Sequence, residues 1–218
     1  MRFWNVFQAL LSPLSSFCQK VLIALYENDI PFNGEIADVV SAEGRAAFVK
    51  IWPIVKFPVL RDQAAGRIVP ESSIIIEYLQ HHAPCKAALV PADPDRAHEV
   101  RLWDRFFDLH VNVPMQKVMS DRRRPEGNRD PLGVTEARDA LVTAYGVLDT
   151  ALSGKRWAAG EEFSMADCAA APALFYANLI VPLGAYRQIA AYFERLSQRP
   201  SYARARREAE PYLQLVPR

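Results

Sequence analysis

The apolar positions near the start of the chain change from strand-like to helical spacing. Residues 2–10 are rich in aromatic and branched side chains, which predicts a strand that Pro13 interrupts. Apolar side chains then return at helical spacing over residues 17–25, which predicts a helix that ends near Asn28. The chain therefore begins with a strand, a loop and a helix.

Hydrophobic patterns predict further strands and helices in the rest of the first third of the chain. Residues 32–39 predict a second strand, and residues 45–49 predict a short helix. Extended runs at residues 57–61 and 67–69 flank a polar, glycine-containing segment, which is the pattern of a β-hairpin. A helix follows from Ser72, so this part of the chain has the order βαβ followed by ββα.

Every strong apolar pattern after this point has helical spacing. Residues 84–92 contain Pro84 and Pro91 and predict a linker between a first domain, residues 1–83, and a second domain, residues 93–218. The second domain has helical patterns at residues 98–119, 135–152, 164–179, 186–195 and 202–210. The predicted fold class is therefore α/β plus all-α.

The charge balance of the chain excludes some kinds of partner. The 218 residues include 26 Lys and Arg against 25 Asp and Glu, which gives no basic surface for a nucleic acid or an anionic membrane. Residues 168–183 are apolar but fall short of the roughly 20 residues of a membrane span, so they predict a buried helix. We therefore expect a small-molecule partner, with no nucleic acid and no membrane.

Cysteine usage indicates a reducing compartment. Cys18, Cys85 and Cys168 form neither an even disulfide set nor a zinc spacing. The apolar start of the chain, residues 1–11, is interrupted by polar side chains and matches a signal peptide poorly. We therefore expect a cytoplasmic protein without a bound metal.

The segment between the first strand and the first helix is the first candidate site. Backbone N–H groups at a helix start favour an anion such as a thiolate, and Ser15 and Cys18 have the spacing of a redox Cys-x-x-Cys motif with serine in the nucleophilic position. Serine forms no mixed disulfide, but its hydroxyl can donate a hydrogen bond to the thiolate of a substrate. The alternatives are that Ser15 or Ser16 only caps the helix, and that Cys18 is either a core residue or a reactive thiol.

Two further segments carry polar groups suited to a peptide-like ligand. Pro58 either simply starts a strand or, with a cis bond, turns the backbone of Phe57 outward to bind an extended peptide. At the next helix start, free N–H groups and the Ser72 hydroxyl suit a carboxylate, and Glu71 suits an ammonium. Plain helix capping by Ser72 is the alternative.

A row of three arginines, Arg122, Arg123 and Arg124, lies between two predicted helices. It is either an anion site or a solvated connection. The Pro, Gly and Asn residues that follow favour the solvated connection.

The three candidate segments occur together and in order, and in this the chain resembles the glutathione transferase superfamily. Residues 56–60, Lys-Phe-Pro-Val-Leu, are similar to the family's Lys-Val-Pro-x-Leu segment with a cis proline. Residues 71–79 are similar to its Glu-Ser-x-Ala-Ile-x-x-Tyr-Leu helix start, and residues 164–167, Ser-Met-Ala-Asp, resemble its Ser/Thr-x-x-Asp capping box. The resemblance covers essentially the whole chain and implies a thioredoxin-like first domain followed by an all-helical domain.

The resemblance implies glutathione as the cosubstrate, with its cysteinyl unit at the first two segments. Ser15 takes the position of the catalytic residue, and the backbone of Phe57, next to Pro58, would pair with the cysteinyl unit. Ser16 replaces the proline that is common after the catalytic residue, so both serines are candidates for thiol activation. The resemblance implies no metal ion.

The two ends of glutathione are assigned in the same way. By resemblance, Glu71 and Ser72 would hold the γ-glutamyl head group, and Lys56 would approach the glycyl carboxylate. Residues 52–55, Trp-Pro-Ile-Val, differ from the family's Asn-Pro-x-Gly. This departure falls at the glycyl end of the site.

The electrophile would bind in the cleft between the two domains. The candidates to line this cleft are Leu14, Phe106, Phe107 and His110, although the two phenylalanines equally fit a helical core. The resemblance implies a homodimeric transferase that activates the glutathione thiolate for attack on small electrophiles. The alternatives are a non-catalytic protein-interaction member, such as the stringent starvation proteins, and a glutathione-dependent disulfide reductase or dehalogenase.

Overall fold

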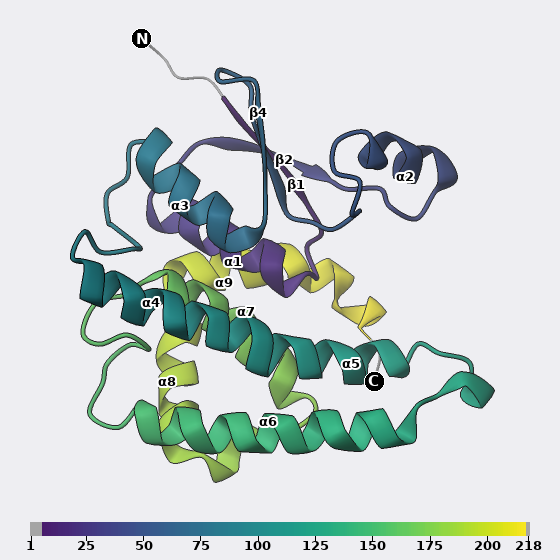
Figure 1. Ribbon diagram of the computed structural model, residues 1–218, viewed down its shortest axis with the longest axis vertical. Coiled ribbons are helices and arrows are strands. Elements are labelled where there is room, and N and C mark those ends of the chain that lie inside the picture. The colour runs from purple at the N-terminus through teal and green to yellow at the C-terminus, as the bar shows by residue number, and fades with distance from the viewer. Residues whose placement is uncertain (1–5, 217–218) are drawn as a thin grey trace.

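A four-stranded mixed sheet organises the first part of the chain (Figure 1). The computed structural model describes residues 6–216. The strands are β1 (Phe7–Leu11), β2 (Phe32–Ile36), β3 (Val59–Asp62) and β4 (Arg67–Pro70). Their order is β2-β1-β3-β4, with β1 parallel to β2 and antiparallel to β3, and β3 and β4 form the predicted hairpin. The part of the predicted first strand at residues 2–5 lies outside the described residues.

Both faces of the sheet are covered by helices. Helices α1 (Ser16–Glu27) and α3 (Ser72–His82) pack on one face, and α2 (Ala42–Val49) packs on the other. Along β1, Ala9 and Leu11 join the core with α1 and α3, whereas Leu10 packs with Phe48 of α2. Because successive side chains of a strand point to opposite faces, a continuous apolar run suits a strand that is buried on both sides.

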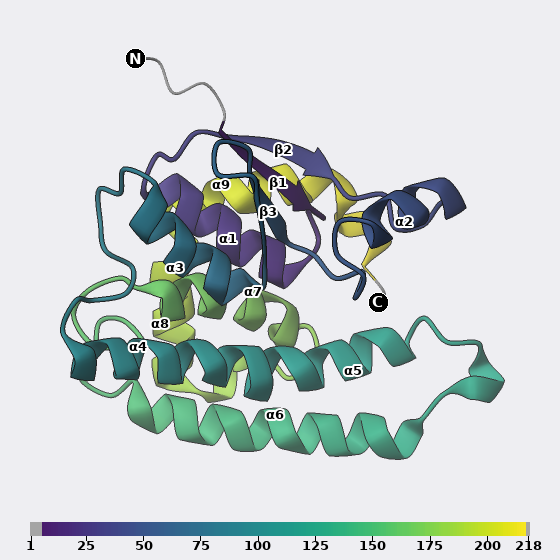
Figure 2. The same ribbon diagram turned by 45° about the horizontal axis from the view of Figure 1, so that its top comes forward.

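The second part of the chain is helical (Figure 2). Its elements are α4 (Pro94–Phe106), the π-helical turn η1 (Phe107–Asn112), α5 (Val113–Asp121), α6 (Pro131–Ala151), α7 (Met165–Asn178), α8 (Arg187–Ser197) and α9 (Pro200–Ala209). Short 3₁₀ turns cover Glu126–Asn128, Leu183–Ala185 and Glu210–Leu215. Residues 83–93, between α3 and α4, contain no helix or strand and include the predicted linker. The predicted α/β plus all-α class is confirmed.

Helices α4 and α5 form one rod that is interrupted by a π-turn, where the sequence predicts a single helix (Figure 1). In a π-turn each N–H bonds to a carbonyl five residues back, so the turn holds one residue more than an α-helical turn. The Val113 N–H donates to the Asp108 carbonyl in this way. Helix α6 lies beside the rod and packs against α5.

Helix α7 joins the two parts of the chain. Nearly all of its residues are buried, and it packs against both α1 and α4, so the two parts share one hydrophobic core. This is the buried helix that the apolar run at residues 168–183 predicts. Across residues 6–216, no helix has both the length and the apolar composition that crossing a bilayer requires.

Candidate functional site

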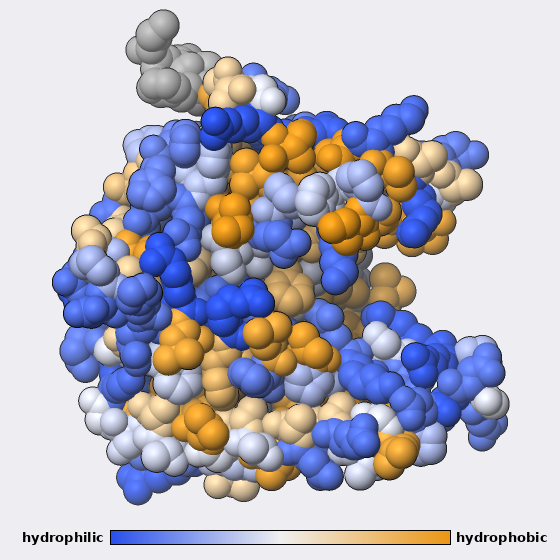
Figure 3. All heavy atoms as spheres, viewed as in Figure 1, coloured by the Kyte–Doolittle hydropathy of each residue, from blue (hydrophilic) through white to orange (hydrophobic). Residues whose placement is uncertain are grey.

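Ser15 lies at the N-terminus of α1, beside a cavity between the two parts of the chain. It is the N-cap residue, with φ −75° and ψ 122°, and its Oγ accepts a hydrogen bond from the Cys18 N–H at 3.3 Å. Ser15 is half-buried, whereas Ser16, the first helical residue, is buried. Both serines line the cavity, whose volume is about 330 Å³. Figure 3 shows a notch in the molecular surface between the sheet domain and the ends of α5 and α6.

The capping and the thiolate-binding interpretations of Ser15 are compatible. A serine hydroxyl has one proton to donate and two lone pairs that accept. The cap uses a lone pair, and within residues 6–216 the Ser15 hydroxyl donates to no other group. Its proton therefore remains available to a ligand in the cavity.

Cys18 is a core residue in this structure. Its side chain is fully buried, and Sγ accepts a hydrogen bond from the Ser12 N–H at 3.3 Å. Burial raises the pKa of Cys18 to about 12, so the thiol is neutral at physiological pH. This favours the core interpretation over the reactive one, because the thiolate is the nucleophilic form.

The backbone before β3 presents free polar groups to the same cavity. The Phe57–Pro58 peptide bond is cis, and Phe57 lines the cavity beside Ser15. Within residues 6–216, the main-chain N–H and C=O of Phe57 make no hydrogen bond. An extended ligand can pair with such groups as an added strand would.

The start of α3 borders a second pocket, with a volume of about 490 Å³. Glu71 has φ 70° and ψ 120°, a left-handed conformation that non-glycine residues rarely adopt, and its side chain does not cap the helix. Ser72 is the first residue of α3 and is buried. The predicted alternative of a plain N-cap is therefore not what the structure shows. The free N–H groups of this helix start are open to a ligand.

The two pockets adjoin each other. Ser16 and Phe17 are consecutive in the chain, and each lines a different pocket. The same holds for Phe57, at the pocket of Ser15, and Lys56, at the pocket of Glu71. The structure thus places the predicted glutathione-binding residues at two pockets that neighbouring residues of the chain line.

A buried polar cluster that the sequence patterns do not indicate lies behind the second pocket. Lys20 on α1 is 1% exposed, and its Nζ lies 2.6 Å from Asp104 Oδ1 and 2.9 Å from Asp108 Oδ2. Lys20 also donates to Ser73 Oγ at 2.9 Å, and Ser73 Oγ donates to Asp104 Oδ2 at 2.6 Å. The cluster connects α1 and α3 with α4 and η1.

Asp108 retains an unused acceptor in this cluster. Its Oδ1 is buried and accepts no hydrogen bond within residues 6–216, and burial raises the pKa of its carboxyl group. Asp108 and Glu71 both line the second pocket. A buried carboxylate oxygen without a partner suits a cationic ligand group.

One signal in the sequence is consistent with this cluster. Gln19 and Lys20 are the only polar residues between Phe17 and Leu25, and a lysine within such an apolar helix needs a buried counter-ion. The identity of its partners does not follow from the sequence, because Asp104 is distant along the chain.

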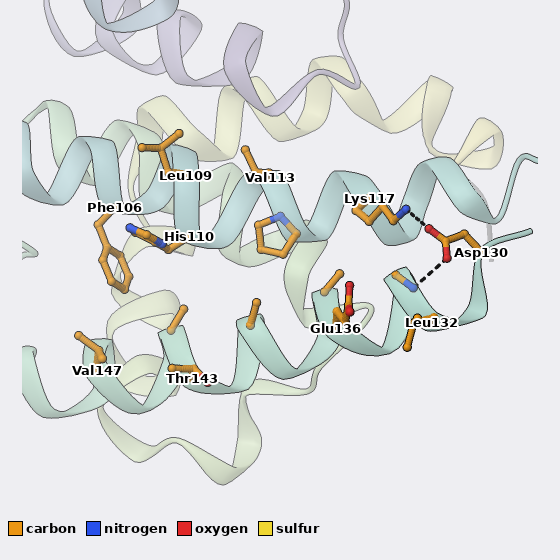
Figure 4. Close-up of a pocket in the computed structure, with 15 residues that line it drawn as sticks. Phe106, Leu109, His110, Val113, Lys117, Asp130, Leu132, Glu136, Thr143 and Val147 are labelled. Atoms are coloured by element: carbon orange, nitrogen blue, oxygen red, sulfur yellow. Dashed lines mark hydrogen bonds and ion pairs between the residues drawn. The ribbon is translucent and has the colours of Figure 1, made fainter.

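The residues predicted to line the electrophile cleft lie in three different places. Leu14 lines the cavity of Ser15. Phe107 is fully buried in the hydrophobic core and lines none of the pockets described here, so the core alternative is the one observed. His110 and Phe106 line a groove of about 850 Å³ between the α4–α5 rod and α6, where Phe106 points toward α6 (Figure 4).

Side chains from the α5 region form the wall of the cavity opposite Ser15. The wall residues that the sequence patterns do not identify are Met115, Gln116, Met119, Ser120, Arg123 and, from α7, Tyr176. Hydrophobic side chains beside a serine hydroxyl suit a small apolar or partly polar ligand. Residues 6–216 hold no group of three or more His, Cys, Asp or Glu side chains placed to bind a metal ion.

A sheet domain followed by a helical domain, with Ser15 and Ser72 at two helix N-termini near their junction, defines the class of glutathione-binding folds that the sequence resembles. The family model "Glutathione S-transferase, N-terminal domain" matches residues 11–87, and "Glutathione S-transferase, C-terminal domain" matches residues 130–195. The chain belongs to the cytosolic glutathione transferase superfamily.

Individual relatives are similar over most of the chain. Glutathione S-transferase GstB of Escherichia coli (strain K12) is 24% identical over 189 residues, which cover 86% of this chain and 91% of that protein. FtsZ-localized protein A of Caulobacter vibrioides is 28% identical over 199 residues, which cover 87% and 86%. The crystal structure of a glutathione S-transferase from Methylobacillus flagellatus KT with GSH bound has a TM-score of 0.83 and 26% identity, covering 91% of this chain and 98% of that one.

Proposed function

We propose that the protein is a glutathione transferase that binds glutathione across the two adjoining pockets and activates its thiol with Ser15. The observation that carries the proposal is the placement of Ser15 and Ser72 at two helix N-termini, with the unpaired main chain of Phe57 beside Ser15. In this arrangement the cysteinyl unit pairs with the backbone of Phe57, and its sulfur reaches Ser15.

The ends of glutathione occupy the second pocket. The N–H groups of the first turn of α3 and the Ser72 hydroxyl bind the γ-glutamyl carboxylate. Glu71 binds the ammonium group, and the free oxygen of Asp108 supports the placement of a cation here. Lys56 is exposed at the same pocket and attracts the glycyl carboxylate.

The catalytic step needs only a modest stabilisation of the thiolate. A free thiol has a pKa of about 8.5, and lowering it by one to two units requires about 1.4 to 2.8 kcal/mol of preferential thiolate binding. A hydrogen bond from the Ser15 hydroxyl and the N-terminus of α1 each supply roughly 1 kcal/mol. The thiolate then attacks a small electrophile held against Leu14 and the α5 wall.

Ser15 also distinguishes a transferase from the other activities of this superfamily. A reductase that works through a mixed disulfide needs a thiol in the position of Ser15, and the nearest thiol, Cys18, is buried and neutral. A protein-interaction role is the second candidate, because one relative is named for its localisation with FtsZ. Turnover of an electrophile distinguishes the two roles.

We further propose a homodimer. Large hydrophobic side chains are exposed on both parts of the chain: Ile68 on β4, Ile74 on α3, and Leu102, Leu109 and Val113 on the α4–α5 rod. Figure 3 shows hydrophobic patches on both lobes of this face. A two-fold dimer that packs the sheet domain of one copy on the helical domain of the other covers both sets.

Free Cys18, Cys85 and Cys168 support a reducing, cytoplasmic environment.

A titration with glutathione, followed by a panel of electrophiles, tests the proposed function. Ser72→Ala should weaken glutathione binding by about 1 to 3 kcal/mol, because it removes a donor to a charged group. Ser41→Ala is the matched control, since Ser41 caps α2 by accepting a hydrogen bond from the Gly44 N–H and lines neither pocket. Calorimetry that gives equal affinities for wild type and Ser72→Ala would remove this part of the site.

A further inference from the structure

Arg123 lies at the cavity of Ser15 and carries a charge that the proposed glutathione site does not use. It follows the C-terminus of α5, its side chain is exposed, and it forms part of the cavity wall. The sequence pattern favours a solvated connection for this arginine row. The structure instead places one of its members at the pocket where the electrophile would bind.

The guanidinium of Arg123 is unpaired in the part of the chain that the structure describes. Within residues 6–216 it forms no ion pair and no hydrogen bond, whereas the neighbouring Arg124 pairs with Asp121 at 3.5 Å. Of the described residues that line the cavity, Arg123 alone is charged, because burial raises the pKa of Tyr176 to about 12 and keeps its phenol neutral. Among the described residues, the cavity lining thus presents one free cation and no carboxylate.

The ends of glutathione are already provided for in the other pocket. Lys56 lies there for the glycyl carboxylate, and Glu71 and Asp108 lie there for the ammonium. Arg123 lines the sulfur pocket instead. An anion bound beside it is therefore a part of the second substrate.

We propose that the electrophile carries an anionic group, such as a carboxylate, which Arg123 binds while the electrophilic carbon faces the sulfur at Ser15. This inference rests on the proposed glutathione site and adds a substrate class to it. A thiolate repels an anionic electrophile, and a guanidinium beside the cavity offsets this repulsion through a bidentate, charge-assisted pair.

The reaction of an α-halo acid illustrates the balance of the step. The glutathione thiol gives its proton to the solvent, and the thiolate sulfur forms a bond to the CH₂ carbon of iodoacetate. The carbon–iodine bond breaks, and iodide leaves with the bonding pair. The product is S-carboxymethylglutathione, and the carboxylate on Arg123 is unchanged throughout.

Two matched ligands test the inference without requiring turnover. S-carboxymethylglutathione and its amide, S-carbamoylmethylglutathione, differ in one negative charge. By calorimetry, the wild type should bind the carboxylate about two- to fivefold more tightly than the amide, as expected for one partly solvated pair. Arg123→Gln should abolish this difference, and Arg123→Lys should keep part of it. Raising the ionic strength should reduce it.

A kinetic test of the same inference compares kcat/KM for iodoacetate with kcat/KM for iodoacetamide. The ratio of these two values is divided by the ratio of the two uncatalysed rates. This ratio should fall about two- to fivefold in Arg123→Gln. Arg129→Gln is the matched control, because Arg129 is an exposed arginine of the same loop that lines neither pocket, and it should keep the wild-type ratio.

The possible contrary results have different meanings. Equal wild-type affinities for the carboxylate and the amide overturn the inference and leave the glutathione site standing. If Arg123→Gln weakens glutathione and both conjugates alike, Arg123 binds glutathione itself, and the inference is again wrong. If the wild type binds no glutathione, the proposed function fails, and this inference fails with it.

Discussion

Lys20 on α1 and Asp104 on α4 form a buried ion pair between the two parts of the chain, with Nζ 2.6 Å from Oδ1 and both side chains 1% exposed. Asp108 adds a second carboxylate to the same ammonium at 2.9 Å. Removal of these charges from water is costly, so the cluster persists only while every member keeps its partners. It fixes α1, and with it Ser15, relative to the helical domain.

Lys20→Met should strongly destabilise the protein. The substitution keeps most of the side-chain volume but removes the buried cation from Asp104 and Asp108, and Asp108 then keeps only the exposed Arg105 at 3.8 Å, so the cost is about 3 to 5 kcal/mol. Chemical denaturation at neutral pH measures the free energy of unfolding. Lys86→Met is the control: Lys86 pairs with Asp29 on the surface, where a pair contributes less than about 1 kcal/mol. An equal loss in the two variants would contradict the role of the buried cluster.

Ser15→Ala should alter the pH dependence of the reaction more than the affinity for glutathione. Without the hydroxyl donor, the pKa of the bound thiol rises, so the rate near neutral pH falls and partly recovers as the pH increases. Ser16→Ala is the comparison, because Ser16 lines the same cavity but is more buried. If Ser16→Ala shifts the pH–rate profile and Ser15→Ala only lowers stability by about 1 kcal/mol, the two serines exchange roles and Ser15 is a simple cap.

Ser15→Cys should introduce an exchange activity that the natural chain lacks. The new thiol would lie at a helix N-terminus, where the pKa of a cysteine is lowered, and it would form mixed disulfides with glutathione. Glutathionylation of the variant, detected by mass spectrometry, would locate the sulfur site. Its absence at pH 8, where about a quarter of an unperturbed thiol is ionised, would place the glutathione sulfur elsewhere.

Cys18 should make the protein less stable in alkali. Its native pKa, about 12, lies above the value of about 8.5 expected in the unfolded chain, so above that pH the unfolded state loses a proton that the folded state keeps. The free energy of unfolding therefore falls as the pH rises through this window, and below it the effect is absent. Cys18→Ala should reduce the loss between about pH 8 and pH 10 by roughly 1 to 2 kcal/mol.

Alkylation provides a check on the same thiol. In the native protein at about pH 8, a thiol reagent should modify the partly exposed Cys85 well before the buried Cys18. Rapid labelling of native Cys18 would contradict its assignment to the core.

Leu102→Asp should shift the proposed dimer toward monomer. Leu102 is 58% exposed on α4, lines none of the pockets described here, and belongs to the hydrophobic face assigned to the dimer contact. A carboxylate buried there without a partner opposes association. Light scattering at micromolar concentration measures the mass. Val40→Asp is the control, since Val40 is 95% exposed and lies in the loop before α2. A wild-type monomer would contradict the proposed dimer itself.

Local sequence patterns predict the parts of the site that depend on helix and strand starts. Ser15, Phe57 and Ser72 each stand where one element gives way to the next, and the chemistry of such positions is set by residues nearby in the chain. The fold follows for a similar reason, because the apolar periods of strands and helices are visible over a few turns.

Contacts between distant segments do not follow from such patterns. The ion pair between Lys20 and Asp104 joins helices from the two parts of the chain. Hydrophobic periodicity shows only that each is a charged residue near apolar ones, and it does not show that the two are in contact. Arg123 is comparable: the composition of its segment indicates solvent exposure, which the structure confirms, but its position at the cavity depends on where α5 ends.

The π-turn at Phe107–Asn112 sets the rotational phase of α5. A regular α-helix turns by about 100° at each residue, and the π-turn absorbs one extra residue within a single wider turn. Residues 113–121 therefore face about 100° away from the directions they would have in an uninterrupted helix of the same length. If this turn became a regular α-helical turn without loss of a residue, Met115 and Met119 would rotate away from the cavity of Ser15. The π-turn thus selects the side chains of α5 that meet the cavity, whereas the contact of Asp104 with Lys20 precedes the turn and does not depend on it.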